Sequence, residues 1–191
     1  MSMQYAYTAI PDKQIPVAAA PVFQHLMTTY ASETNKAVSV WREFSADDLS
    51  FRPHPRASTV GDILKHQLLS ERRFFAEFLG VPEPPAAEAV PAEHTVPAYC
   101  ERLRTRAIAR LEFLATQGEP WWLSIVPFFD VERQRIWVFW RRVLHTAHHR
   151  TQLSVYLRVM GRAVPAIYGP TADVTWAGAD PTNSIQAAER K

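Results

Sequence analysis

Proline and glycine most restrict what this chain can fold into, because both residues interrupt regular helices. They divide the chain into four long segments in which apolar residues recur at helical spacing: residues 22–44, 58–79, 97–117 and 134–160. The last three segments are each followed directly by a glycine, as is typical of helix ends: Gly80, Gly118 and Gly161. The spacing therefore predicts four amphipathic helices.

No segment carries a convincing strand pattern, so we expect an all-α fold. Each helix alone would be marginally stable, and packing of the four apolar faces must supply most of the stability. We expect residues 22–161 to form one four-helix bundle, preceded by an N-terminal extension (residues 1–21). The remaining residues, 162–191, contain three prolines and are expected to wrap the bundle surface as a tail.

The segments between the helices differ in how clearly they can be interpreted. Residues 45–57 and 81–96 are rich in proline and read as loops. Residues 119–133 contain two prolines but also bulky apolar side chains, so either a short hairpin or an irregular hydrophobic flap fits. Its aromatic residues are expected to lie in the core or in a dimer interface rather than to cover a substrate: Trp121, Trp122, Phe128 and Phe129.

The composition excludes several classes of protein. Of 191 residues, 47% are hydrophobic, which is enough for a substantial core, and the formal net charge is only +2. Without a long basic run, we expect no nucleic-acid partner. No apolar stretch is long enough to span a membrane, and the first residues do not resemble a secretory signal. With a single cysteine, which cannot form an internal disulfide, these features predict a cytoplasmic protein.

Two histidines of the last predicted helix have the spacing of a metal-binding pair. His145 and His149 are four residues apart, so they lie on one helix face with Cβ atoms about 5–6 Å apart. Two imidazoles at this spacing can reach one metal ion, although a core histidine more often only makes hydrogen bonds. His148 points about 100° away from His149 and is expected at the surface.

A third ligand must come from another helix, and His66 is the best candidate. It lies within the second predicted helix on a stripe that tends inward, where an unpartnered histidine would be costly to bury. Together with His145 and His149, it would form a three-histidine site. Three protein ligands leave coordination positions open, which is the pattern of catalytic rather than structural zinc.

Other polar residues near these histidines are weaker candidates. Ser70, Gln152 and Tyr156 share the histidine faces and could line a cavity or orient a ligand, although plain packing is their simpler role. Arg141 and Arg142 could meet an anionic substrate at the site mouth, or simply be solvated. Two further residues are expected to play no part: Glu71 should face away from the metal, and Cys100 should be a small core residue.

The sequence of the last helix resembles the signature of the DinB family (DinB/YfiT superfamily). The run HTAHHRTQLSVYLRVMG, which begins at His145, is similar to the family pattern H-x-x-H-H-R-G-Q-L-x-x-Y-L-R-x-x-G, with Thr151 in place of a glycine. Three shorter stretches also resemble family segments and occur in the family order: FRP from Phe51, STVGDILKH from Ser58 and PAIYGPTAD from Pro165. The resemblance extends over residues 22–173.

The resemblance implies an up-down-down-up four-helix bundle with a metal site at one end. By position, the family ligands correspond to His66, His145 and His149, and the ion would be divalent, with zinc or nickel favoured. The resemblance also implies a homodimer. Some relatives use a low-molecular-weight thiol as cosubstrate.

Three functional hypotheses follow. The first is a metal-dependent thiol transferase or hydrolase, in which the open metal position activates a thiol or a water and acts on a small-molecule substrate. The second is a non-enzymatic, stress-related metal-binding or interaction module, which the lack of an evident general base favours. The third is a structural bundle whose histidines bind nothing.

Overall fold

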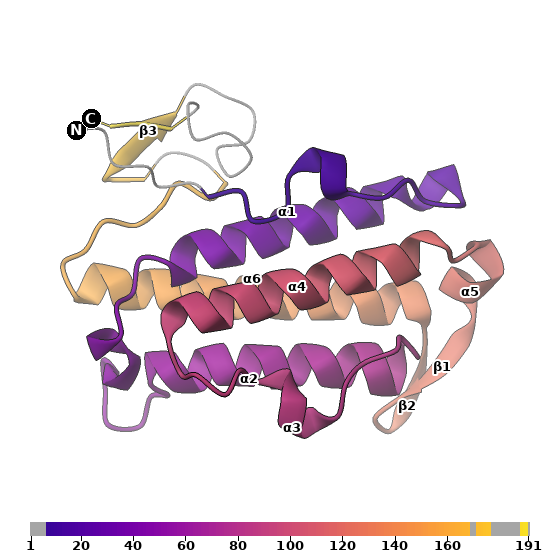
Figure 1. Cartoon of the computed structure of the whole chain (residues 1–191), viewed down its shortest axis with the longest axis horizontal. Helices are drawn as coiled ribbons and strands as arrows, with labels where there is room; N and C mark the ends of the chain where they lie inside the picture. The colour runs from indigo at the N-terminus through magenta and orange to yellow at the C-terminus, as the bar shows by residue number, and fades with distance from the viewer. Residues whose placement is uncertain (1–6, 169–170, 177–187, 191) are drawn as a thin grey trace.

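Four long helices build the core of the computed structural model, which describes residues 7–168, 171–176 and 188–190. They are α1 (Gln24–Trp41), α2 (Val60–Arg73), α4 (Val96–Ala115) and α6 (Arg135–Val159). Helices α1 and α6 run in one direction, and α2 and α4 run in the other (Figure 1). The predicted up-down-down-up four-helix bundle is therefore confirmed.

Short elements connect and flank these helices. Four of them are short helical turns, η1 to η4, and two are short α-helices, α3 and α5; two pairs of strands complete the described part. Their bounds are η1 Asp12–Gln14, η2 Pro21–Phe23, η3 Asp47–Ser50, η4 Phe74–Phe78, α3 Ala86–Ala89, α5 Glu119–Leu123, β1 Ile125–Phe128, β2 Val131–Gln134, β3 Val174–Trp176 and β4 Ala188–Arg190. The π-helical η4 prolongs α2, and α3 lies in a segment that was predicted to be a loop.

The start of α2 is fixed by a capping box. The Thr59 hydroxyl accepts a hydrogen bond from the Asp62 amide (3.1 Å), and the Asp62 carboxylate accepts one from the Thr59 amide (3.1 Å). These two bonds satisfy backbone donors that a helix start otherwise leaves unpaired. The cap therefore defines the first residue of the helix that carries His66.

Residues 119–133 fold as the short helix α5 and a hairpin, which confirms the hairpin alternative. Strands β1 and β2 are antiparallel, with Phe128 opposite Val131. The segment divides its aromatic side chains between two environments, because Trp122 is fully buried in the core whereas Phe129 at the hairpin turn is 60% exposed. The hairpin lies at the end of the bundle where α6 begins (Figure 1).

Two buried ionic clusters join the helices inside the bundle. Glu71 of α2 accepts a hydrogen bond from the Tyr30 hydroxyl (2.7 Å) and pairs with Arg110 of α4 (3.3 Å). Glu33 of α1 pairs with Arg150 of α6 (2.5 Å). Because removing one partner leaves a buried charge uncompensated, each cluster specifies which helix faces meet.

The segment after α6 contacts the bundle through polar side chains. Arg162 pairs with Asp48 (2.6 Å), and the Tyr168 hydroxyl donates to Glu33 (2.8 Å). Strands β3 and β4 pair with each other further along. Residues 169–170, 177–187 and 191 of the predicted tail, and residues 1–6 of the predicted N-terminal extension, lie outside the described residues. In the ranges that the structure describes, no helix is both long enough and apolar enough to cross a bilayer.

The Glu33–Arg150 pair makes stability depend on pH. Burial alone would raise the pKa of Glu33, but Arg150 and Lys36 outweigh it and hold the pKa below its ordinary value of 4.5. Because the folded-state pKa is lowered, the contribution of Glu33 is fully present above about pH 4.5 and is lost as the pH falls through the folded pKa.

We therefore expect Glu33→Gln to lower the free energy of unfolding by about 3 kcal/mol at pH 7, since Arg150 remains buried without its partner. The difference from wild type should shrink below pH 4.5, where wild-type Glu33 also becomes neutral. Urea unfolding followed by circular dichroism measures both values, with exposed Glu112→Gln as the control. A difference that is the same at pH 7 and pH 3 would contradict this role of Glu33.

Candidate metal centre

The structure brings His66, His145 and His149 together on facing sides of α2 and α6. The ring centroids are 5.4 Å apart for His66 and His145, 4.9 Å for His66 and His149, and 4.6 Å for His145 and His149. One nitrogen of each ring lies within 4.8 Å of the other two. Within the described part of the chain, these histidines are the only group of three or more His, Cys, Asp or Glu side chains that could hold a metal ion.

Two expectations about this cluster are wrong. The three histidines were expected at one end of the bundle, but His66 lies near the middle of α2, and His145 and His149 lie near the middle of α6. His66 was expected to be buried, but it is exposed, because a cavity opens beside it where α2 faces α6. The cluster is therefore open to ligands from the side of the bundle.

A chain of hydrogen bonds orients His149. Its Nδ1 lies 2.9 Å from the Gln152 side-chain oxygen, which can only accept, so Nδ1 carries the ring proton. The Gln152 amide donates to the Tyr156 hydroxyl (3.2 Å), which donates to the Ser58 carbonyl (3.0 Å). The lone pair of His149 is therefore at Nε2. Partners of this kind fix the tautomer and orientation of metal-binding histidines.

His145 has a different neighbour. Its Nδ1 lies 2.6 Å from a guanidinium nitrogen of Arg142. A guanidinium only donates, so Nδ1 accepts this bond and a neutral ring then carries its proton on Nε2. To bind a metal, His145 must turn its ring or exchange this hydrogen bond for the metal bond. Arg142 and a metal ion therefore compete for the same imidazole.

Arg142 is buried, which corrects the expectation that it is solvated. Only 1% of the residue is exposed, and its guanidinium donates to the Gln67 side-chain oxygen (2.5 Å), to the Ser70 hydroxyl (3.0 Å) and to the Thr146 hydroxyl (2.9 Å). No carboxylate of the described residues forms an ion pair with it, and burial lowers its pKa to about 10. It therefore remains charged at neutral pH and ties α2 to α6.

Gln67 and Thr146 are site residues that sequence reasoning did not identify. Gln67 also donates to the Thr146 carbonyl of α6 (3.4 Å) and is 1% exposed. A glutamine on the apolar face of a predicted helix was the signal that could have found it, because buried amides require hydrogen-bond partners.

All three histidines are held in the neutral form. Partial loss of solvent around the rings is the main cause that lowers their pKa values, for the exposed His66 as well as for the half-buried His145 and His149, and the charge of Arg142 lowers them further. For His145 the pKa falls to about 3. A neutral imidazole is the form that binds metals, so at neutral pH these rings do not have to lose a charge before they bind one.

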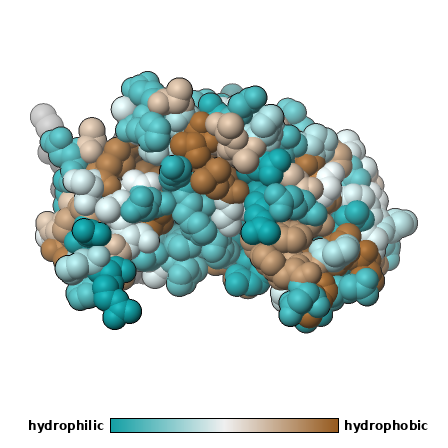
Figure 2. Space-filling view, turned by 90° about the horizontal axis from the view of Figure 1, so that it is seen from below, coloured by the Kyte–Doolittle hydropathy of each residue, from teal (hydrophilic) through white to brown (hydrophobic). Residues whose placement is uncertain are grey.

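A cavity of about 580 Å³ lies over the cluster. It is lined by His66, Leu69, Ser70, Arg73, Phe74, Phe128, Phe129, Arg141 and His145. Ser70 thus lines the cavity as the sequence suggested, whereas Gln152 and Tyr156 lie behind His149 in the hydrogen-bonded chain and are not among the lining residues. Figure 2 shows the molecule from the side of α2 and the hairpin, with one group of hydrophobic side chains at the hairpin end, on the right, and others in the middle and toward the left of this face.

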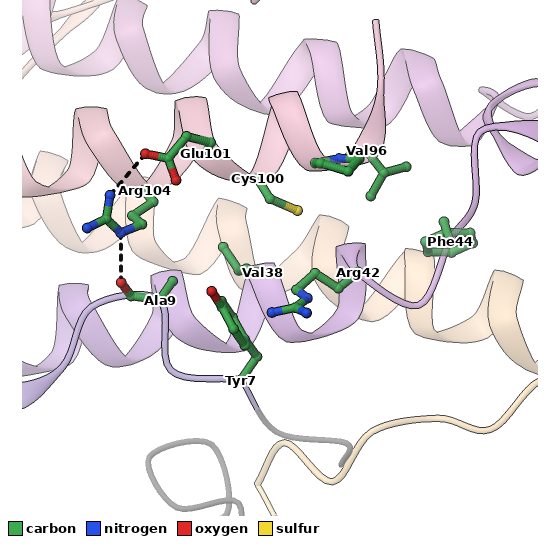
Figure 3. Close-up of a pocket in the computed structure, with 10 residues that line it drawn as sticks. Tyr7, Ala9, Val38, Arg42, Phe44, Val96, Cys100, Glu101 and Arg104 are labelled. Atoms are coloured by element: carbon green, nitrogen blue, oxygen red, sulfur yellow. Dashed lines mark hydrogen bonds and ion pairs between the residues drawn. The ribbon is translucent and has the colours of Figure 1, made fainter. Parts of the chain in front are cut away.

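The other candidates are not part of the three-histidine group, although the His148 ring lies beside that of His149, with centroids 4.9 Å apart. His148 is exposed, Glu71 pairs with Tyr30 and Arg110, and Cys100 is buried. Cys100 borders a second cavity of about 370 Å³ between α1 and α4 (Figure 3). Burial raises the pKa of its thiol to about 12, so it is protonated at neutral pH and unsuited to act as a nucleophile.

The chain behind His149 predicts a measurable effect on metal binding. We expect Gln152→Met to weaken the affinity for zinc by about 10- to 100-fold, because the His149 ring loses the acceptor that fixes its tautomer. Competition with a chromogenic chelator measures the affinity. Gln117→Met, which changes a glutamine outside the site in the same way, is the control and should bind zinc like wild type. Equal affinities for all three proteins would rule out this role for Gln152.

Comparisons with known proteins agree with the fold and the motif. The DinB family model matches residues 18–180. A DinB-like protein from Bacillus cereus ATCC 10987 is 20% identical, with a TM-score of 0.66 over 75% of this chain and 95% of that one. The DinB-like protein YjoA from Bacillus subtilis is 21% identical, with a TM-score of 0.60 over 75% and 96%. No curated protein matches the chain significantly. The family match covers most of the sequence, and the chain belongs to the DinB family.

Proposed function

We propose that this DinB-family protein binds one divalent metal ion through His66, His145 and His149. The proposal rests on one observation: three neutral imidazoles from two helices place a nitrogen each within 4.8 Å of one another. Three nitrogen ligands without a carboxylate suit zinc or nickel. Such a set leaves coordination positions free, and the cavity over His66 and His145 gives a small molecule access to them.

We further propose that the protein is an enzyme, either a transferase of a low-molecular-weight thiol or a hydrolase. A bound divalent ion would lower the pKa of a coordinated thiol or water and so provide a nucleophile at neutral pH. The chain supplies the remaining parts. Gln152 orients His149, burial and the charge of Arg142 together keep the histidines unprotonated, and the phenylalanines of the cavity exclude water from a substrate.

A non-enzymatic metal-binding module is the second candidate, and one observation favours it. None of the nine residues that line the cavity is a carboxylate, so none is an evident general base. The size of the cavity favours the enzyme instead, because about 580 Å³ is far more than one water needs and falls in the range of small-molecule sites.

Metal content and activity together test the proposal. We expect about one zinc or nickel ion per chain in wild-type protein by mass spectrometry, and a loss of most of it in His145→Ala. His148→Ala is the matched control, because this neighbouring histidine is exposed and lies outside the cluster, and it should keep its metal. Equal metal content in the three proteins would contradict the site.

The metal-loaded protein should then be assayed with several thiols and an electrophilic acceptor, and with hydrolysable esters. The enzymatic proposal expects turnover with at least one pair, and its loss in His145→Ala but not in His148→Ala. Full metal occupancy without turnover for any thiol or ester would favour the non-enzymatic module.

We also propose that the protein is a homodimer. Three large apolar residues of α6 are more than half exposed and recur at helical spacing along one side of the helix: Leu144, Val155 and Val159. An exposed apolar row of this kind is typical of a contact surface. Light scattering during size exclusion should give twice the chain mass for wild type and a lower mass for Leu144→Glu. A monomeric wild type would contradict the proposal.

A further inference from the structure

The cavity over the histidines is positively charged even without a metal ion. Two arginines and no carboxylate line it. Arg73 pairs with Glu77 (2.9 Å), but it shares this carboxylate with Arg72 (3.2 Å). Arg141, in contrast, forms no hydrogen bond or ion pair within the described ranges, although it lies one helical turn before His145. An unpaired cation at the wall of a cavity attracts anions.

The buried Arg142 reinforces this charge from behind. It contacts His145 and Ser70 of the cavity wall, and it too has no carboxylate partner among the described residues. A charge in a buried position is screened less by salt than one at the surface. The positive potential is therefore built into the wall of the cavity, and a metal ion would add to it.

Aromatic side chains form the rest of the cavity wall. Phe74 stacks near His145, with ring centroids 6.3 Å apart, and Phe128 packs against Phe74 at 5.7 Å. Phe129 extends this group at the hairpin turn, 4.8 Å from Phe128, and remains 60% exposed. The cavity thus combines a cationic side with an apolar, aromatic side.

The backbone at Phe129 is unusual. Its φ angle is +54°, and among the described residues it is the only one besides glycines with a positive φ. It is the first residue of a two-residue hairpin turn, and where such a turn needs positive φ at this position, glycine is the usual occupant. Strained positions of this kind cluster at ligand sites. A large exposed aromatic ring occupies this position and lines the cavity.

We infer that the cavity binds an amphiphilic anion, with a carboxylate or sulfonate held by Arg141 near His145 and an aryl or alkyl body against Phe128 and Phe129. This substrate class deepens the proposed function and rests on it for any reaction, but the binding itself does not require a metal ion. A volume of about 580 Å³ is ample for one such molecule.

Calorimetric titration with 4-phenylbutanoate and its uncharged analogue 4-phenylbutan-1-ol tests the anionic half. Each is titrated into metal-free and zinc-loaded protein, with zinc content measured in every sample. We expect the acid to bind more tightly than the alcohol in both forms. Arg141→Gln should weaken acid binding about fivefold, the effect of one partly exposed charge pair, and leave alcohol binding and zinc content unchanged. Arg56→Gln, an exposed arginine outside the cavity, is the control.

Phe129→Gly tests the aromatic half. Glycine relieves the positive φ, so the variant should keep its thermal unfolding midpoint while binding of acid and alcohol weakens equally, by roughly fivefold. A midpoint that falls without any change in binding would show that Phe129 serves the hairpin alone and would overturn this half.

Failure of this inference can be told apart from failure of the proposed function. Equal binding of acid and alcohol, or acid binding that Arg141→Gln does not weaken, would overturn the anion site whether or not zinc is bound. Protein that binds no zinc but still prefers the acid through Arg141 would support the anion site while contradicting the metal site.

Discussion

The hydrogen bonds of the buried Arg142 hold α2 beside α6, and the candidate site depends on them. Arg142 lies on α6, whereas Gln67 and Ser70, which accept its hydrogen bonds, lie on α2. Because Gln67 is the neighbour of His66 in sequence, fixing Gln67 also fixes how far along α6 the His66 ring lies. A shift of one helical turn between the helices would take the two α2 acceptors, Gln67 and Ser70, away from a buried guanidinium, which is costly. The spacing of the three imidazoles therefore follows from a structural constraint outside the cluster.

The electrostatics of the site follow from the same residue. The buried cation beside His145 adds to the burial that keeps the histidines neutral, and it makes the cavity wall positive. The two effects act on two different ligands. Neutral nitrogen ligands accept a divalent cation, and the surrounding positive charge then favours an anionic molecule at the open positions. The protein side of the site is positively charged, and this charge favours a negatively charged ligand.

The sequence predicts those features that local spacing determines. Proline and glycine delimit the four helices, and the i,i+4 spacing places His145 and His149 on one face. Features that arise from tertiary packing were harder to predict. A charged residue such as Arg142 is normally expected at the surface, and only the polar groups that α2 presents to it make its burial tolerable.

The same limit explains the other corrections. The exposure of His66 depends on the cavity beside α2, and a helical pattern cannot show whether another helix covers a given face. The choice between flap and hairpin for residues 119–133 depended on the turn at Phe129, where the sequence lacks the glycine that usually marks such a turn. The position of the site along the bundle depends on the register of α2 against α6. This register arises from contacts between the two helices, so the spacing within either helix alone does not predict it.

X-ray absorption at the zinc edge of the zinc-loaded protein tests the central claim most directly, because it reports which atoms surround the ion. We expect a first shell dominated by nitrogen at about 2.0–2.1 Å, with the outer-shell scattering of three imidazoles. That scattering should fall by about one imidazole in His66→Ala, whose side chain comes from the other helix. A shell that contains sulfur, or that is unchanged in His66→Ala, would contradict the three-histidine site.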